Sequence, residues 1–522
     1  MATSSVRLAL HGLGALGLLA ASIAPVQAAQ LYASDGLEIR WDNTLRYSLA
    51  LRHDSPSAEL LSYANGDDGD RNFAPGLVMN RFDLLSKLDI AIGDFGLHAS
   101  AAGWYDTVYQ SRTDNTSPAT SNTAFPARQF APAVRSLEGQ HAELADAFAY
   151  GNFNLMQMPV SVRAGRQTLL GGESHFFDAN SIAAAMAPTD YLKAMTDQNG
   201  YSGNMFLPVT QANVTLQPLP WLSVSLYDQF EWRPSRQPGD GSYLSYVDYT
   251  GAGASRIFLT PDRTLVHGTD SGPASGQYGI LLHASVADMD LGFYALRFRA
   301  KDPIAALVAD PALAGQTGAV GYYRLVYPAG INLYGASFST EWNGNILAGE
   351  VSARQNTPLV SYDPRTPEVT TLPGGPYYSR GDTLHAQASW TTELAETSIW
   401  DKADAAAEIA TDNILGFNNM ALGAPPFSRF TMKARARLEP HYFQALPNLD
   451  ITAVAELGYN LAGRSFTYYA QDSGSGDFRI GVSGTYLSAW KAGLSYIGFL
   501  GSPARQPLAD RNFVMLSLER TF

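Results

Sequence analysis

Residues 37–52 read LEIRWDNTLRYSLALR, and this stretch decides the fold class. Its odd positions are mostly apolar, whereas most of its even positions are charged or polar. An alternation with a period of two predicts a β-strand with one apolar and one polar face. The usual soluble strand has about five to six residues, so a strand of this length and pattern is typical of a transmembrane barrel. We expect Trp41 and Leu45 to face lipid, and Arg40 and Arg46 to face water.

The same alternation recurs to the end of the chain, with short turns and long loops in succession. The predicted strands are 37–52, 82–92, 97–105, 141–153, 160–169, 210–216, 222–232, 278–286, 291–301, 320–340, 346–354, 383–390, 400–410, 430–438, 449–459, 478–486, 490–499 and 513–522. Residues 320–340 are interpreted as one long strand, and the alanines of 400–410 suit a helix as well as a strand. The sequence therefore predicts an all-β transmembrane antiparallel barrel of about 18 strands, an even number as in bacterial single-chain barrels.

Composition and the first residues indicate export. Residues 1–28 carry Arg7, an apolar run and Val26-Gln27-Ala28, which predicts a signal peptide cleaved after Ala28 and a barrel over 29–522. No later stretch of about 18 apolar residues could span a membrane as a helix. The net charge of −13 argues against nucleic acid as a partner, and the absence of cysteine excludes disulfides and thiolate sites. We expect the outer membrane of a Gram-negative bacterium.

The final predicted strand places Val514, Leu516, Leu518 and Phe522 on one face. This pattern resembles the C-terminal signature by which the barrel-assembly machinery recognises its substrates. Because a closed barrel has no free edge, we expect the last strand to pair with the first and Phe522 to take part in closure.

Several stretches resemble a family of Gram-negative outer-membrane proteins known only by a domain-of-unknown-function label. They are 67–73 (DDGDRNF), 165–167 (GRQ), 172–174 (GES), 229–234 (QFEWRP), 241–243 (GSY) and 333–338 (LYGASF). Gly171 stands where the family pattern has a Trp. The resemblance implies a barrel that acts beside a periplasmic partner and an inner-membrane transporter of the resistance-nodulation type, in the traffic of hydrophobic compounds.

Charged residues on the polar faces of the strands are candidates for the wall of the lumen. The candidates are Arg40, Arg46, Arg52, Arg163, Glu231, Arg429, Lys433, Arg435, Arg437 and Glu456. The row from Arg429 to Arg437 lies on one face of a strand, and in a water-filled pore such a row selects anions. The alternative is that these cations pair with acids across the wall, among them Glu456.

The loop 171–205 is the candidate for a constriction. It opens with paired glycines, has Ala-rich helical character over 181–196 interrupted by Pro188, and carries many apolar side chains for a loop in water. The residues proposed to form the plug or lid are Glu173, His175, Phe176, Phe177, Met186, Tyr191 and Met195. Either the loop folds into the lumen or it covers the mouth as an outer lid.

Two polar clusters suggest chemistry only weakly. Asp67, Asp68 and Asp70 lie among glycines and could contribute to a calcium site, but they lack the spacing of a full calcium loop. A solvated loop, or one bridged by divalent ions to surface lipid, is the preferred interpretation. The adjacent residues Glu173, Ser174 and His175 do not predict a triad, which depends on geometry. We expect no catalytic residue and no cofactor.

These observations favour a channel or transporter for a hydrophobic or amphipathic small molecule in the outer membrane. Its expected surroundings are outer-membrane lipid and lipopolysaccharide. The alternatives are a membrane-embedded lipid hydrolase, which needs a Ser/His pair near lipid, and a structural or adhesive barrel, which needs longer loops.

Overall fold

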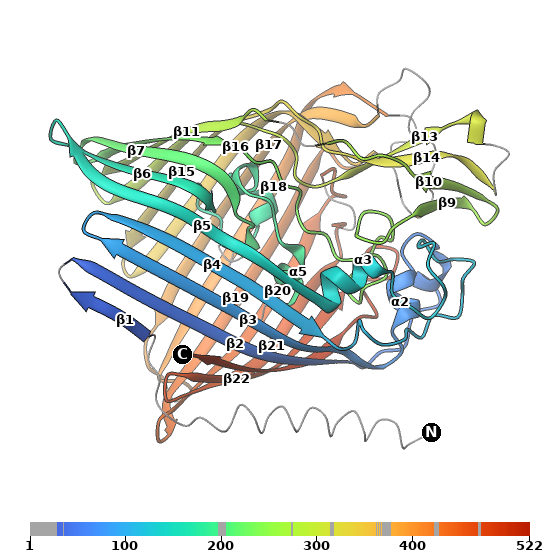
Figure 1. Ribbon diagram of the computed structural model, residues 1–522, viewed down its shortest axis with the longest axis horizontal. Coiled ribbons are helices and arrows are strands. Elements are labelled where there is room, and N and C mark those ends of the chain that lie inside the picture. The colour runs from blue at the N-terminus through green and yellow to red at the C-terminus, as the bar shows by residue number, and fades with distance from the viewer. Residues whose placement is uncertain are drawn as a thin grey trace.

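The computed structural model describes residues 29–34, 36–196, 205–272, 275–313, 318–361, 363, 365, 367, 377–421, 427–467 and 471–522. A closed antiparallel barrel of 18 strands dominates the fold, which confirms the predicted fold class (Figure 1). Its strands are β2 (Leu37–Arg52), β3 (Gly76–Ile92), β4 (Phe95–Asp106), β5 (Gln140–Leu155), β6 (Met158–Gln167), β7 (Val209–Leu219), β8 (Leu222–Gln229), β11 (Gln277–Val286), β12 (Met289–Phe298), β15 (Ile331–Trp342), β16 (Asn345–Leu359), β17 (Ser379–Leu394), β18 (Lys402–Asn419), β19 (Phe430–Leu446), β20 (Leu449–Ala462), β21 (Gly476–Tyr486), β22 (Trp490–Leu500) and β23 (Phe513–Thr521). The predicted signal peptide, residues 1–28, lies outside the described residues.

The first and last strands close the barrel. β23 pairs with β2 from Thr44 opposite Thr521 to Arg52 opposite Phe513. Beyond β23, the backbone of Phe522 exchanges hydrogen bonds of 2.8 and 2.9 Å with Asn43. A short additional strand, β1 (Ala29–Ser34), pairs with β2 where β23 has ended. The edge of β2 is therefore covered along most of its length, as a barrel in lipid requires.

The outer face of the barrel is apolar. Trp41, Leu84 and Leu97 are 45%, 47% and 55% exposed, although they are large apolar side chains. The opposite face of the strands carries buried polar residues such as Glu350 and Lys433. An apolar exterior on a closed antiparallel barrel is the arrangement of an outer-membrane protein, so the protein resides in the outer membrane of a Gram-negative bacterium.

Short turns gather at one end of the barrel and long loops at the other, which by the usual rule are the periplasmic and extracellular ends (Figure 1). Between β15 and β16 the chain turns at Asn343 and Gly344, whose φ values of 50° and 74° fit a two-residue hairpin turn. The long loops carry the short helices η1 (Leu60–Ser62), α2 (Asp68–Asn72), α3 (Pro132–Val134), η2 (Arg135–Gly139), η3 (Asp178–Asn180), α4 (Ala183–Met186), α5 (Tyr191–Thr196) and η5 (Pro311–Leu313). Among the described residues, none of the helices has the length and apolar character to span a bilayer.

A second, four-stranded sheet lies at the extracellular end and was not predicted (Figure 1). It has the order β13-β14-β10-β9 and consists of β9 (Arg256–Thr260), β10 (Arg263–His267), β13 (Ile304–Ala309) and β14 (Ala319–Val326). The prediction of one strand over 320–340 is wrong, because β14 belongs to this sheet and β15 to the barrel. Pro328 lacks a backbone donor and Gly330 has a φ of 73°, so the chain leaves one sheet and turns into the other between them. Within 400–410, residues 402–410 belong to β18, so this stretch is strand and not helix.

Candidate functional site

Part of the loop between β6 and β7 lies inside the barrel. We call residues 171–187 the inward segment. Within it Ile182 and Met186 have no exposed surface, and α4 ends at Met186 just before Pro188, as its sequence predicts. They pack against buried side chains of β8, β11, β12 and β15, namely Tyr227, Leu281, Tyr294, Leu296, Phe298, Ile331 and Leu333. The loop therefore folds inward and does not rest only over the mouth.

Glu408 of β18 anchors the first part of the inward segment. Its carboxylate accepts the backbone N–H groups of His175 at 3.1 Å, Phe176 at 2.5 Å and Phe177 at 3.0 Å. Hydrogen bonds to an ionised acceptor are stronger than neutral ones, so three of them fix this stretch of backbone against the wall. The sequence analysis missed Glu408, because a single acidic residue in a segment of uncertain structure carries no distinguishing signal.

Glu350 of β16 holds the same segment at two further points. It accepts the N–H of Glu173 at 2.7 Å and that of Ile182 at 2.8 Å. Gly172 lies directly against it with a φ of 95°, and a Cβ at this position would be 2.1 Å from Glu350 Oε2. Arg354 of the same strand donates to the carbonyl oxygen of Asn180 at 2.6 Å. The wall thus supplies acceptors and a donor that match the backbone of the segment.

A chain of hydrogen bonds on β17 and β18 has the composition of a hydrolytic triad. His385 Nδ1 lies 2.6 Å from Asp412 Oδ1, and His385 Nε2 lies 2.9 Å from Thr383 Oγ1. Thr383 has no exposed surface, however, and its hydroxyl also lies 2.8 Å from that of Thr357. A nucleophile must reach its substrate, so this geometry favours a structural network over catalysis.

A cavity of about 270 Å³ borders the inward segment on the extracellular side. Aromatic and aliphatic side chains line much of it, namely Tyr246, Tyr249, Phe298, Ile331 and Leu359. Lys301 and Asp302 form part of the same wall, and Lys301 donates to Ala185 O at 2.8 Å. Burial lowers the pKa of Lys301 to about 7. The cavity therefore combines an apolar lining with a few polar groups, which is the usual make-up of a small-molecule site.

The predicted cationic row is largely neutralised within the wall. Arg435 pairs with Glu456 and with Asp477 at 2.7 Å, and Arg437 pairs with Glu456 at 2.8 Å. Lys433 is buried, and its ammonium lies 5.1 Å from the centroid of the Phe177 ring. These contacts agree with the pairing alternative for Arg435 and Arg437.

Arg429 does not belong to this row. β19 begins at Phe430, and the Arg429 guanidinium turns to the carbonyl oxygens of Ile414 and Leu415 on the neighbouring strand. It also lies 5.0 Å from the ring centroid of Phe417, which is exposed on the outer face. Its assignment as a lumen residue is wrong, because the strand whose alternation would point it inward begins only at Phe430.

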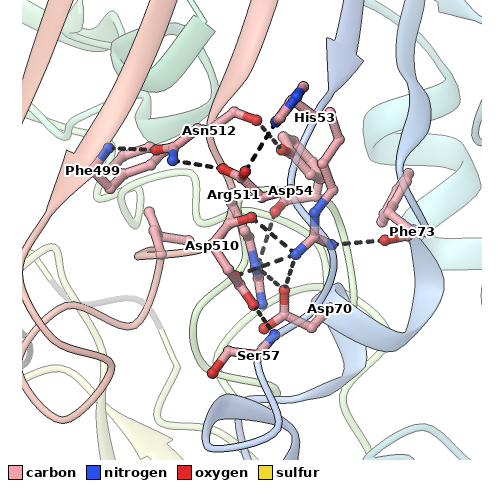
Figure 2. Close-up of polar contacts among 12 residues, drawn as sticks. His53, Asp54, Ser57, Asp70, Phe73, Phe499, Asp510, Arg511 and Asn512 are labelled. Atoms are coloured by element: carbon pink, nitrogen blue, oxygen red, sulfur yellow. Dashed lines mark hydrogen bonds and ion pairs between the residues drawn. The ribbon is translucent and has the colours of Figure 1, made fainter.

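The acidic loop 67–70 is buried, so its interpretation as a solvated loop is wrong. Asp70 has no exposed surface and pairs with Arg52 at 2.9 Å and with Arg511 at 3.0 Å (Figure 2). Arg52 also lies 3.2 Å from Asp510, and its side chain is fully buried, so it does not line an open lumen as predicted. Two charges of each sign thus satisfy one another where the ends of β2 and β23 meet the loops.

Asp67 and Asp68 have different partners. Asp67 pairs with Arg71, whereas Asp68 faces Asp240 and Asp248 of the loop after β8. Burial, followed by repulsion from neighbouring carboxylates that include Asp67, raises the pKa values of Asp68, Asp240 and Asp248. The three aspartates that the sequence analysis grouped therefore do not form one site. Asp67 and Asp70 are paired with arginines, whereas Asp68 belongs to a cluster of carboxylates.

A family model described as "Protein of unknown function (DUF1302)" matches residues 9–522. The chain belongs to the DUF1302 family. A search of curated proteins found no match for this DUF1302 chain.

Solved structures similar to this DUF1302 protein include three outer-membrane proteins of low identity. OccAB3 of Acinetobacter baumannii is 9% identical, with a TM-score of 0.46 over 93% of this chain and 99% of its own. The outer membrane channel DcaP of the same organism is 10% identical, with a TM-score of 0.40 over 95% and 100%. OccK8 (OprE) of Pseudomonas aeruginosa is 10% identical, with a TM-score of 0.42 over 93% and 97%.

Most of the other predicted residues of the DUF1302 barrel lie apart from the cavity, although Tyr191 is part of its lining. Arg40 pairs with Asp42 at 2.9 Å and its side chain is 55% exposed, while Arg46 lies 4.0 Å from Asp83. The guanidinium of Arg163 lies over the ring of Phe148. Glu231 accepts hydrogen bonds from the N–H and the hydroxyl of Thr210. The hydroxyl of Tyr191 donates to Asp302 at 3.2 Å. The side chain of Met195 lies outside the described residues.

Proposed function

We propose that this protein is a channel that passes a small hydrophobic or amphipathic solute across the outer membrane. The inward segment carries the proposal. A barrel of sixteen to eighteen strands encloses an aqueous pore if nothing fills it. Five backbone hydrogen bonds to Glu350 and Glu408 tie this segment to strands of the wall, which supports its role as the constriction of the lumen.

The cavity beside the segment supports the class of solute. Its volume of about 270 Å³ is near the lower limit of about 300 Å³ for ligand pockets, which suits a compact molecule. Aromatic rings such as Tyr246 and Tyr249 offer apolar contact, while Lys301 and Asp302 can orient a polar end. The solute would bind here and then move past the inward segment by passive diffusion.

Deletion of Ser181 to Thr196 tests the proposal. The shortened barrel should show higher single-channel conductance in planar bilayers, because the lumen loses its constriction. Uptake of a hydrophobic solute into proteoliposomes should fall, because the wall of the cavity is lost. Heat-modifiable migration on a denaturing gel checks that the barrel itself has folded. A folded deletion variant with unchanged conductance would refute the constriction.

The expected partners of the channel stay predictions. They are outer-membrane lipid, lipopolysaccharide, the assembly machinery, a periplasmic partner and an inner-membrane transporter. A lipid hydrolase would need an accessible nucleophile, and Thr383, the candidate in the His385 network, is fully buried and so cannot reach a lipid. We therefore favour a channel without catalytic activity.

A further inference from the structure

Three carboxylates from two loops converge inside the extracellular end of the protein. Asp68 belongs to the loop between β2 and β3, and Asp240 and Asp248 belong to the loop between β8 and β9. One oxygen of each residue lies within 4.8 Å of the other two. Two oxygens that each bind one Ca²⁺ at about 2.4 Å are at most about 4.8 Å apart, so the spacing fits a common ion.

The side chains are buried, and part of their hydrogen-bonding capacity is unused. Asp240 is 5% exposed, and no donor among the described residues reaches either of its carboxylate oxygens, so its side chain can form a hydrogen bond only by sharing a proton with Asp248. Asp248 has no exposed surface, and in the part of the chain that the structure describes its Oδ1 likewise has no donor. A buried carboxylate without partners is costly, because the protein interior replaces none of its lost hydration.

The other oxygens of the cluster are held in place. Asp68 Oδ2 accepts the backbone N–H of Asn122 at 2.7 Å, and Asp248 Oδ2 accepts the backbone N–H of Asp68 at 2.9 Å. These donors orient two of the carboxylates from behind, which is how outer partners fix the ligands of a metal. No Lys or Arg nitrogen of the described residues lies within 4.0 Å of the three carboxylates, and Arg511, whose charge acts on Asp248, is itself paired with Asp70.

We propose that Asp68, Asp240 and Asp248 bind one divalent cation, Ca²⁺, which ties the two extracellular loops together. Carboxylate oxygens are hard ligands, which select Ca²⁺ or Mg²⁺ over transition metals. Ca²⁺ is the better fit, because the ligands come from separate loops and Ca²⁺ accepts irregular coordination, whereas Mg²⁺ demands near-octahedral geometry.

The ion would also shape the cavity. Asp248 stands between Val247 and Tyr249, both of which line the cavity of about 270 Å³. Tyr249 and Val247 in turn pack in the core of the four-stranded sheet with Ile257 and Leu265. A cation at Asp248 therefore fixes this wall of the cavity and the base of the small sheet. The binding of the ion is independent of the proposed transport.

Calorimetric titration of CaCl₂ into the full chain tests the site. The protein is refolded in detergent without lipopolysaccharide, which itself binds divalent ions, and is stripped with a chelator. Wild type should bind one Ca²⁺ per chain, with a Kd in the range of about 0.1–1 mM known for extracellular modules. Asp240→Asn should weaken binding at least about tenfold, because the isosteric amide removes one of the charges that hold the ion.

Asp262→Asn is the matched control, since Asp262 is a fully exposed aspartate in the turn between β9 and β10. It should bind Ca²⁺ as wild type does. Chymotrypsin provides a second measurement: Ca²⁺ should slow cleavage within 240–250 in wild type but not in Asp240→Asn. Equal Ca²⁺ affinity in folded wild type and Asp240→Asn, or no saturable binding by wild type, would overturn the proposal. Tighter binding of Mg²⁺ than of Ca²⁺ would overturn the choice of ion.

Discussion

The carboxylate of Glu408 accepts the backbone N–H of Phe177 at 3.0 Å, across 231 positions of the chain. The aromatic ring of Phe177 lies beside the ammonium of Lys433, which belongs to the next strand of the wall. Backbone and side chain of Phe177 are therefore both fixed by the barrel, so the inward segment is built into the wall. Its position can be changed by substitutions in strands that are distant in sequence.

Glu408→Gln should loosen the inward segment. In glutamine an NH₂ group replaces one acceptor oxygen, so at least one of the three backbone N–H groups of His175, Phe176 and Phe177 loses its acceptor. We expect higher single-channel conductance with an unchanged barrel, measured in planar bilayers and by heat-modifiable migration. Glu396→Gln, an exposed acid in the turn between β17 and β18, is the control and should conduct as wild type does. A Glu408→Gln channel indistinguishable from wild type would contradict the anchoring role.

Arg511→Met should loosen the loops at the extracellular end. The guanidinium is fully buried and donates to Asp70 at 3.0 Å and to the carbonyl oxygen of Tyr243 at 2.8 Å. Removal of one partner from a buried ion pair costs about 3–5 kcal/mol. Chymotrypsin should therefore cleave the loops faster, while Arg135→Met, which removes an exposed guanidinium bonded to Gln110, should leave the rate unchanged. Equal rates for the two variants would show that the buried pair contributes little.

Lys301 should make the stability of the folded protein depend on pH. Burial disfavours the ammonium and lowers its pKa from the ordinary 10.5 to about 7 in the folded protein. The unfolded chain binds the extra proton between these values, so this contribution to stability rises from pH 7 to about pH 10.5 and is constant below pH 7. The difference in denaturation midpoint between wild type and Lys301→Met measures the contribution of Lys301 separately from that of other titratable groups. A difference that is the same at pH 7 and pH 10 would contradict this assignment.

Deletion of Phe522 should lower the amount of assembled barrel in the outer membrane. The backbone of Phe522 contributes two hydrogen bonds to Asn43, and these are lost with the residue. Phe522→Ala keeps the backbone and removes only the ring, so it should assemble better than the deletion if closure of the edge is the cause. The heat-modifiable fraction in isolated outer membranes measures both variants. Equal assembly of the deletion variant and wild type would contradict this prediction.

Single cysteines on β2 test which face meets lipid, in a chain with no cysteine of its own. Arg40→Cys and Arg46→Cys should react with a membrane-impermeant maleimide in opened outer-membrane vesicles, whereas Trp41→Cys and Leu45→Cys should be protected by lipid. The alternation of side chains along a strand is the reason. Similar labelling at all four positions would be incompatible with a strand that crosses the membrane.

The barrel could be predicted because its signal is local. Each strand, such as Leu37–Arg52, shows its two faces in its own residues, and lipid on one side and water on the other impose the same rule on every strand. The number of strands followed from this pattern, and loop length and apolar content distinguished 171–205 from the other loops. The pattern failed at Val320–Thr340, where two strands of similar composition enter different sheets.

The arrangement of the site depended on contacts that only the closed barrel creates. Glu350 and Glu408 look like ordinary acids on a strand until the inward segment lies against them. Asp68 and Asp248 meet across 180 positions, and nothing in either stretch indicates the other. The class of fold can be predicted from the residues in their order, because alternation is a property of neighbouring residues. Which carboxylates hold a backbone and which face one another depends on the folded barrel, because only folding brings these distant segments together.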